Sequence, residues 1–450
     1  MLRVDHALIV GGGFSGVLLA INLLRHGSLK VTLVERRADR LAGGLAFGAA
    51  HEDHVLNVRA GNMSALPDRP GHFGEWLEAQ GLGQEASFAT RRDYGRYLRA
   101  MLDEAREKAG DRLAIVHDEV VDLRLSDNGV QAMTRSRQPI SADIAVIAPG
   151  NLPPHCLPAF AGMDSPVYVD DPWARNISKG LDAADSVMLL GSGLTAVDCA
   201  LGLDQAGFKG RILALSRRGL MPHRHAPALP HDKRTERPVG TASQLVAMIR
   251  ARCAEIGWRN AVDELRPYTQ DMWRAADADV RHRFLRHLRP YWDVHRHRIA
   301  PQVADRIDGM KAQQQLIVQA AKVVAAREDG DGAIITIRPR RSAAVEEVQV
   351  ARVVNCTGPL GDLNRTSDPL LQNLTQRGDI RADPLAIGID VDRQCRAIAL
   401  DGKAQQRLFA VGPMTRGAHW EIVAVPDIRR QLWALAREVT GAHWVEAEGL

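Results

Sequence analysis

The 450-residue sequence has few cysteines, no long hydrophobic run and little net charge. Its five cysteines form no Cys-x-x-Cys pair, which argues against a thiol–disulfide relay and a zinc site and fits a reducing compartment. No run of about 18 apolar residues occurs, so we expect no membrane-spanning helix. The net charge is only +4. These absences favour a cytoplasmic protein without bound metal, and its length allows two or three domain cores.

A glycine-rich turn, Gly11–Gly16, lies near the N-terminus. The apolar run 7–10 before it predicts a buried parallel strand, and the run 17–24 after it predicts a packed helix. A second apolar strand, 31–34, ends at Glu35. Strand, glycines, helix, strand and acid in this order are typical of a dinucleotide-binding βαβ unit.

Each glycine of this turn has its own role: Gly11 permits the tight turn, Gly13 lets the backbone approach a pyrophosphate, and Gly16 lets helix and strand pack closely. Glu35 can accept hydrogen bonds from a ribose hydroxyl, and its charge disfavours a 2′-phosphate. The site therefore fits FAD or NAD rather than NADP, and we assign it to FAD. The residues of this region expected to contact FAD are Gly11, Gly13, Phe14, Ser15, Gly16, Glu35, Arg36 and Gly150.

A second glycine-rich turn, Gly191–Ala196, follows the apolar strand 186–190 and leads into a predicted helix at 197–203. The next strand, 211–215, ends at the run Ser216–Gly219, in which arginine replaces the acid. Guanidinium groups there suit the 2′-phosphate of NADPH, so we expect NADPH, with NADH as the less favoured cofactor and a solvated basic turn as the alternative. The expected contacts are Gly191, Gly193, Leu194, Thr195, Arg217 and Arg218.

The order of predicted elements is similar after each of the two glycine-rich turns. After each turn, β-rich segments lead back to an apolar strand that ends in a small-residue turn, at 144–150 and again at 353–358. This pattern predicts an α/β fold with two Rossmann-like dinucleotide-binding domains, one inserted into the other. We expect residues 1–160 and 350–450 to form the FAD-binding domain, residues 165–220 and 310–345 the NAD(P)-binding domain, and residues 221–309 a helical insertion.

The segment from Arg217 to Met310 is too long for an ordinary connection, and its apolar residues recur at helical spacing. It holds 18 lysines and arginines against 11 acidic residues. An anionic substrate, an acidic partner or RNA would explain this charge. However, no aromatic-basic RNA-binding pattern occurs, and basic residues opposite an apolar stripe usually form a solvated face. We therefore expect no nucleic-acid partner. The predicted stripe consists of Val280, Phe284, Leu285, Leu288 and Trp292.

Further motifs accompany the two turns. They are Gly44-Leu45-Ala46-Phe47-Gly48, His54-Val55-Leu56-Asn57-Val58 with Met63-Ser64, Arg91 to Leu98, Asn355-Cys356-Thr357-Gly358-Pro359, and Gly412 to Gly417 before Trp420-Glu421-Ile422. With them, the chain resembles over nearly its whole length a family of bacterial FAD/NAD(P)-binding oxidoreductases. That family is more distantly similar to class B flavin monooxygenases and N-hydroxylases.

The resemblance implies that four more residues line the FAD site: Asn57, Met63, Gly412 and Thr415. For Asn57, a turn residue that caps its own backbone is the alternative. Two departures stand out. Many two-dinucleotide flavoproteins have aspartate at the position of Pro413, and the Baeyer–Villiger pattern needs histidine at the position of Pro166. A Baeyer–Villiger reaction is therefore not supported.

The resemblance further implies an FAD-dependent, NAD(P)H-consuming oxidoreductase, and we expect a monooxygenase that acts on a small molecule with oxygen through a C4a-(hydro)peroxyflavin. Two alternatives stay open: a flavin reductase or oxidase without oxygen insertion, and a flavoprotein whose basic insertion docks RNA or an acidic protein. The cofactors supply the difficult chemistry, so no catalytic side chain is assigned. Asn57, His419 and Glu421 are candidates, and a surface loop pair is the alternative for the last two. A homo-oligomer is compatible with the sequence.

Overall fold

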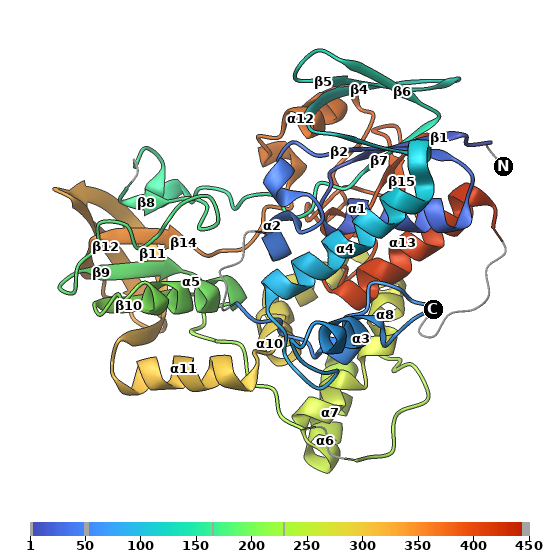
Figure 1. The fold of residues 1–450 in the computed structure, drawn as a ribbon. Helices are drawn as coiled ribbons and strands as arrows, with labels where there is room; N and C mark the ends of the chain where they lie inside the picture. The colour runs from blue at the N-terminus through green and yellow to red at the C-terminus, as the bar shows by residue number, and fades with distance from the viewer. Residues whose placement is uncertain (1–2, 49–53, 164–165, 228–229, 443–450) are drawn as a thin grey trace. The chain divides into compact units, whose positions relative to one another are not determined.

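The computed structural model describes residues 3–48, 54–163, 166–227 and 230–442 (Figure 1). The chain divides into two compact units: unit 1 is Met1–Leu152 with Leu360–Leu450, and unit 2 is Pro153–Pro359. The insertion of one α/β unit into another is as predicted. The chain leaves unit 1 after Leu152 and returns at Leu360, and these two residues form an isolated antiparallel bridge.

Unit 1 is built on a six-stranded sheet with the order β15-β16-β7-β1-β2-β3, which is parallel except for the pair β15–β16. A three-stranded antiparallel sheet, β4-β5-β6, accompanies it. The stretch 113–121 is divided between β3 and β4. The strands are β1 (His6–Val10), β2 (Lys30–Val34), β3 (Leu113–Val116), β4 (Val120–Ser126), β5 (Gly129–Thr134), β6 (Pro139–Ala142), β7 (Ile144–Ile147), β15 (Arg396–Ile398) and β16 (Ala404–Ala410).

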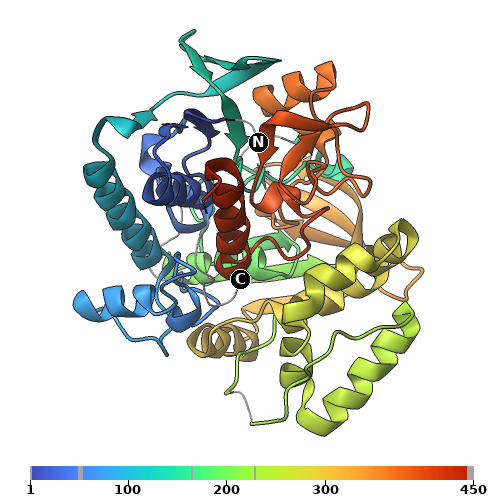
Figure 2. The ribbon, with the colours of Figure 1, turned by 90° about the vertical axis from the view of Figure 1, so that its right-hand side faces the viewer.

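Alternate residues of β1 serve two different cores, because successive strand residues point to opposite faces of a sheet. Ala7 and Ile9 pack with helices α1, α3, α4 and α13, whereas Leu8 packs with β4, β5 and α12. Helices α1 and α13 lie side by side (Figures 1 and 2). The helices of unit 1 are α1 (Phe14–His26), α2 (Gly44–Gly48), α3 (His72–Ala79), α4 (Arg91–Ala109), α12 (Pro369–Arg377) and α13 (Val425–Thr440).

Unit 2 is built on a seven-stranded sheet with the order β13-β12-β11-β10-β9-β14-β8. The strands from β11 to β8 are parallel, and β12 and β13 extend the sheet as antiparallel strands. Helix α11 packs on α5 and β11. The elements of the sheet layer are β8 (Tyr168–Val169), β9 (Ser186–Leu190), β10 (Arg211–Ser216), β11 (Leu316–Asp329), β12 (Gly332–Pro339), β13 (Glu346–Val350), β14 (Arg352–Asn355), α5 (Leu194–Gln205) and α11 (Pro301–Ala312).

Two predicted boundaries are corrected by these pairings. Strand β14 lies beyond the expected boundary at 350, but it pairs with β9 and β8 and so belongs to unit 2. The predicted boundary at 309 cuts helix α11 and leaves most of it in the insertion, but the helix packs on α5 and β11 of the unit 2 sheet layer. In both cases a tertiary partner determines which unit holds the element, and the local pattern contains no sign of that partner.

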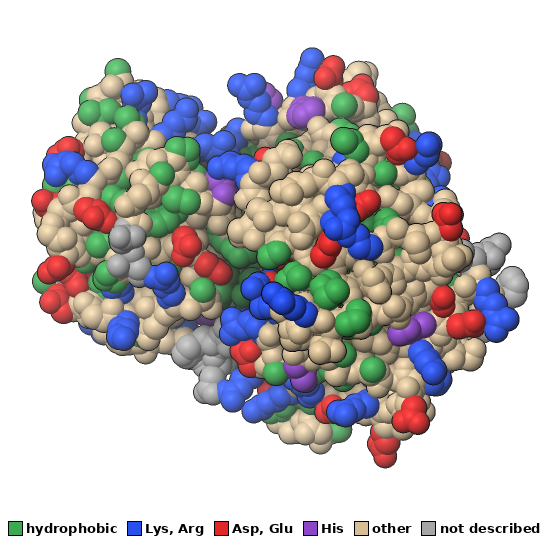
Figure 3. All heavy atoms as spheres, turned by 90° about the horizontal axis from the view of Figure 1, so that it is seen from above, with side chains coloured by type: hydrophobic (Ala, Val, Ile, Leu, Met, Phe, Trp, Pro, Cys, Tyr) green, Lys and Arg blue, Asp and Glu red, His purple; other side chains and the backbone are tan. Residues whose placement is uncertain are grey.

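The helical insertion itself comprises α6 (Ala242–Ile256), α7 (Trp258–Asp263), α8 (Thr269–Ala275), α9 (Ala278–Arg283) and α10 (Arg289–Arg296), with a π-helical turn at Phe284–Leu288. The predicted apolar stripe is half-buried. Several arginines of the insertion form ion pairs within it, among them Arg252 with Glu264 and Arg298 with Asp263. On the face of the molecule seen in Figure 3, basic and acidic side chains are interspersed.

Candidate dinucleotide sites

The first glycine-rich turn joins the carboxyl end of β1 to the start of α1. Gly11 has a φ of +106° and lies against Ala148 O, and a β-carbon on Gly16 would overlap Gly11 O. A side chain at Gly16 would therefore force strand and helix apart, and one at Gly11 would clash with the chain just after β7. The contacts of these glycines with FAD stay predictions.

The N-terminus of α1 has no side-chain cap, because its N-cap residue is Gly13. Helix α4, by contrast, is capped by Thr90, whose hydroxyl accepts from Asp93 N. The first N–H groups of a helix need an acceptor and attract anions. Gly13 also lies close to the backbone of Gly44, so this end of α1 is bordered by main chain. The arrangement fits a pyrophosphate.

Glu35 directly follows β2 and is buried, with 9% of its surface exposed. Its Oε2 accepts from Gly12 N at 2.7 Å and its Oε1 accepts from Arg37 N at 2.9 Å. These bonds fix the carboxylate beside the glycine turn, and a carboxylate has further lone pairs for a ribose. Arg36 instead forms ion pairs with Glu119 and Asp368.

The loop after β16 reaches the same turn. A β-carbon on Gly412 would lie 2.6 Å from Ser15 Oγ, so two segments predicted to bind FAD meet here. Gln431 of α13 holds the loop: its Oε1 accepts from Gly412 N at 2.8 Å, and its Nε2 donates to Thr415 Oγ1 at 2.9 Å. Sequence reasoning missed Gln431, whose only signal is a polar residue on the apolar face of α13.

The segment that holds Asn57 and Met63 lies between α2 and α3. Met63 is buried in the core of unit 1, and Asn57 is half-buried. Arg429 of α13 donates from Nη1 to Ser64 O at 2.7 Å and so ties this segment to the C-terminal helix. Gly150 has a φ of +70° just beyond β7. The predicted roles of these residues toward FAD stay predictions.

His419 and Glu421 are buried, with 6% and 7% of their surfaces exposed, so the alternative of a surface loop pair is wrong. His419 Nε2 lies 3.9 Å from Cys395 Sγ. Cys395 and Glu421 both have positive φ, +62° and +68°, which is uncommon for residues with a side chain. The backbone is therefore in an uncommon conformation at Glu421, four residues before α13 begins, and at Cys395.

The second glycine-rich turn repeats the first in unit 2. Gly11 N donates to Val34 O and, equivalently, Gly191 N donates to Leu215 O. Gly191 has a φ of +130° and lies against Cys356 O, as Gly11 lies against Ala148 O. Helix α5 again starts without a side-chain cap, at Gly193. Leu194 and Thr195 form the first turn of this helix.

The equivalence of Val34 and Leu215 corrects one detail of the sequence analysis. Ser216, and not an arginine, stands at the position of Glu35. Its hydroxyl lies 2.8 Å from Ser192 Oγ and accepts from Gly219 N at 3.0 Å. A neutral hydroxyl thus replaces the carboxylate, and the charge against a 2′-phosphate is absent from this position.

The two arginines that follow Ser216 differ in their surroundings. Arg217 is exposed and has no hydrogen bond or ion pair with any residue in the described part of the chain. Arg218 donates to Arg286 O and His287 O and lies over the Tyr291 ring, 5.2 Å from its centroid. Arg217 is therefore available to a phosphate, whereas Arg218 holds the helical insertion against the turn.

Two thiols lie beneath the second turn. Cys199 of α5 and Cys356 after β14 are both buried, and their sulfur atoms are 3.6 Å apart. The contact with Cys356, together with burial, raises the pKa of the Cys199 thiol well above its usual value. The Cys199 thiol therefore remains protonated at neutral pH and packs against Cys356.

The described residues contain no group of three or more His, Cys, Asp or Glu side chains arranged to hold a metal ion. None of the helices in the described ranges is both long and apolar enough to cross a bilayer.

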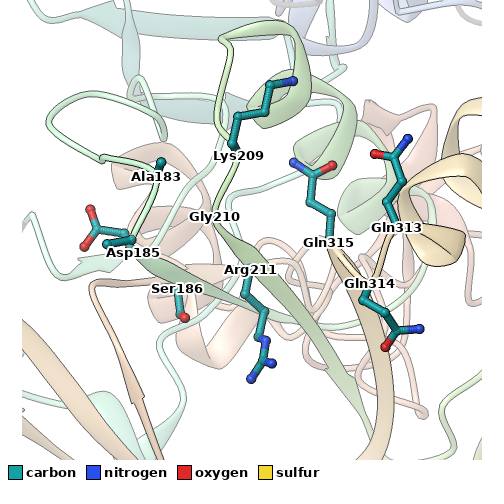
Figure 4. A pocket seen from close by; sticks show the side chains of 10 residues that line it. Ala183, Asp185, Ser186, Lys209, Gly210, Arg211, Gln313, Gln314 and Gln315 are labelled. Atoms are coloured by element: carbon teal, nitrogen blue, oxygen red, sulfur yellow. The ribbon is translucent and has the colours of Figure 1, made fainter.

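A hollow of about 440 Å³ opens on unit 2 and is lined by Asp185, Lys209, Arg211 and Gln313 to Gln315, among others (Figure 4). It lies where β9, β10 and β11 begin. Dinucleotides bind outside the carboxyl ends of such strands, where the glycine turn is. We therefore place the candidate site at the turn and not at this hollow.

Comparison with known proteins agrees with this architecture. Residues 8–152 match a protein-family model described as FAD-NAD(P)-binding. No curated protein matches the sequence. Among solved structures, the reduced form of ornithine hydroxylase from Pseudomonas aeruginosa is similar with a TM-score of 0.68 at 16% identity, covering 98% of this chain and 99% of that one.

Two further structures are similar. Ornithine N-hydroxylase from Kutzneria sp. 744 has a TM-score of 0.66 at 15% identity and covers 97% and 99% of the two chains. Bacillithiol disulfide reductase from Bacillus cereus has a TM-score of 0.56 at 12% identity and covers 98% and 99%. The chain has the fold of flavoproteins with two dinucleotide-binding domains. At these identities the likeness concerns the fold alone, since one fold hosts many activities.

Proposed function

We propose that this protein is an FAD-dependent, NADPH-consuming monooxygenase that acts on a small molecule. One observation carries the proposal: two glycine turns of the same geometry end in different groups, the Glu35 carboxylate in unit 1 and the Ser216 hydroxyl followed by Arg217 in unit 2. The first suits the unsubstituted ribose of FAD, and the second suits the 2′-phosphate of NADPH.

The residues of unit 1 that would hold FAD are those at the first turn and the loop brought against it. The uncapped end of α1 would face the pyrophosphate, and Glu35 would accept from the ribose. Gln431 fixes Gly412 and Thr415 beside Ser15. Bound FAD would supply electron transfer from NADPH to an acceptor. The protein's part is to orient the cofactors and exclude water.

Oxygen insertion is the finer part of the proposal. It is supported by the similarity of the whole chain to ornithine hydroxylases, one of which is described with reduced FAD, NADP⁺ and L-ornithine. Disulfide reduction is the activity named for the third similar protein. The neighbouring thiols Cys199 and Cys356 lie under the turn proposed for NADPH and not at the turn proposed for FAD. We therefore favour oxygenation of a small substrate.

The cofactor assignment predicts that purified protein is yellow and that NADPH bleaches its flavin absorbance faster than NADH under anaerobic conditions. NADH serves as the matched control because it lacks only the 2′-phosphate. A colourless protein that takes up no FAD would contradict the assignment of unit 1. Equal rates of flavin bleaching with NADPH and NADH would contradict the assignment of unit 2 to NADPH.

Oxygenation is tested by the ratio of hydrogen peroxide formed to NADPH consumed in air. Without substrate, we expect peroxide to account for most of the NADPH. A substrate should lower that ratio and yield a product heavier by one oxygen atom, with L-ornithine and other small amines as the first compounds to try. If peroxide matches NADPH with every compound, the protein is an oxidase.

A further inference from the structure

Arg429, in the second turn of α13, has no carboxylate partner among the residues described. Its Nη1 donates to Ser64 O, but its Nε is buried and has no acceptor. Other enclosed arginines are better satisfied: Arg352 Nε donates to Pro166 O at 3.1 Å, and Arg416 Nε donates to Pro413 O at 2.9 Å. Burial lowers the pKa of Arg429, which indicates a desolvated cation.

Tyr94 of α4 carries a second donor without an acceptor. Its side chain is fully buried, and its hydroxyl has no hydrogen-bond partner. Its ring packs among Phe47, Phe73 and Phe14 at centroid distances of 4.6, 4.9 and 6.2 Å. A buried polar group without a partner destabilises the folded protein. By contrast, the neighbouring Tyr97 hydroxyl lies 2.8 Å from His72 Nδ1 and accepts from Ala65 N.

The two side chains reach the same segment of the chain: the Tyr94 ring lies 5.6 Å from the Tyr97 ring, whose hydroxyl accepts from Ala65 N, and Arg429 donates to the adjacent Ser64 O. Each also adjoins a segment assigned to FAD, since Arg429 bonds to Ser64 and the Tyr94 ring contacts Phe14 of the glycine turn. Two unsatisfied donors, one of them charged, therefore converge on the flavin-binding side of unit 1.

We propose that Arg429 and Tyr94 form an anion subsite in unit 1, where a negatively charged oxygen of a ligand accepts from both. A charge-assisted hydrogen bond from the guanidinium would provide most of the affinity, and the phenol would add direction. Two ligands carry such an oxygen: the pyrimidine edge of reduced FAD, and the carboxylate of a small substrate. This inference rests on the proposed function, because it deepens the description of the same site.

The test compares Arg429→Met with Arg430→Met, which removes the same charge from the next, exposed position of α13. Three quantities are measured on each protein: the FAD dissociation constant, the midpoint potential of the bound flavin, and the affinity for straight-chain aliphatic monocarboxylates followed by tryptophan fluorescence. The Arg430→Met protein should match the wild type in all three. Arg429→Lys should restore part of what Arg429→Met loses, because it keeps the charge.

The three measurements distinguish the two ligands. If the flavin edge is bound, Arg429→Met should lower the potential and weaken FAD binding at least about tenfold, with carboxylate binding unchanged. If a substrate carboxylate is bound, carboxylate affinity should fall by about that factor with FAD binding and potential unchanged. Both results support the subsite. Identical behaviour of the Arg429→Met and Arg430→Met proteins in all three measurements would overturn it.

Tyr94→Phe provides a second test that does not depend on the charge. Removing an unsatisfied hydroxyl should leave the ligand-free protein at least as stable as the wild type. It should nevertheless lower the affinity for the ligand that Arg429 binds. A tyrosine that only fills the core would leave ligand binding unchanged, and that result would remove Tyr94 from the subsite. A wild-type protein that binds no FAD would contradict the proposed function instead, while the carboxylate titration would still test Arg429.

Discussion

At the scale of single residues, Arg217 and Arg218 are adjacent but have different roles. Arg217→Ala should raise the KM for NADPH by a factor equivalent to roughly 1 to 3 kcal/mol and leave the KM for NADH unchanged, because only the 2′-phosphate contact is lost. Arg218→Ala should affect both cofactors alike, since its guanidinium bonds to the insertion at Arg286 and His287. Steady-state kinetics with both cofactors test this. Equal effects of Arg217→Ala on NADPH and NADH would exclude the phosphate contact.

The different surroundings of these two arginines could not be predicted from the sequence. The glycines and Glu35 could be predicted because a turn and a strand end fix their positions within a few residues. The sequence could not show that Ser216 takes the position of Glu35, since that follows from the bond of Gly191 N to Leu215 O. Nor could it show that Tyr291, more than 70 residues later in the chain, engages Arg218.

At the scale of elements, α13 holds the loop of the proposed FAD site through Gln431. Gln431→Leu should lower the free energy of unfolding by about 1 to 3 kcal/mol, because Gly412 N loses its buried acceptor and Thr415 loses a partner. It should also weaken FAD binding, since the loop beside Ser15 is released. Denaturant unfolding and FAD titration measure the two effects. Gln406→Leu, at an exposed position of β16, is the control and should change neither.

A Gln431→Leu protein with unchanged FAD affinity would show that the loop is held by other contacts.

The elements around this loop could be predicted from the sequence, but the contacts between them could not. Helix α13 and strand β16 follow from apolar periodicity and from Pro426 in the first helical turn. The bonds that α13 makes to the segments at Ser64 and at Gly412 are contacts between distant parts of the sequence, and no local pattern contains them.

At the scale of the whole molecule, the assignment of one cofactor to each unit predicts selective protection by ligands. FAD should slow amide hydrogen exchange at the start of α1 and at the end of β2, and NADP⁺ should slow it at α5 and after β10. A ligand at about 100 times its dissociation constant stabilises the state that binds it by about 2.7 kcal/mol. Exchange mass spectrometry on both complexes measures this. Protection of α1 by NADP⁺ would reverse the assignment.

The nesting of the two units could be predicted from the returning strands, but its boundaries could not. The predicted boundary at 350 lies before β14. Both units contain an apolar strand that ends in small residues, so this pattern alone does not show to which unit such a strand belongs. Only its pairing with β9 assigns it to unit 2. The same holds for α11. Its sequence would equally fit a further helix of the insertion, and only its packing on α5 assigns it to the sheet layer of unit 2.

The bridge between Leu152 and Leu360 has a consequence for the order in which the chain assembles. Strand β16 joins β7 only after the chain has closed a loop that contains all of unit 2. The entropy lost on closing a flexible loop grows with its length. Once unit 2 is folded, however, its first and last segments are close together, since Asn355 Nδ2 donates to His155 O at 3.0 Å, and the remaining loop to be closed is short. Folding of unit 2 thus lowers the entropy cost of pairing β16 with β7. We therefore expect the last strands of unit 1 to join their sheet most readily after unit 2 has folded.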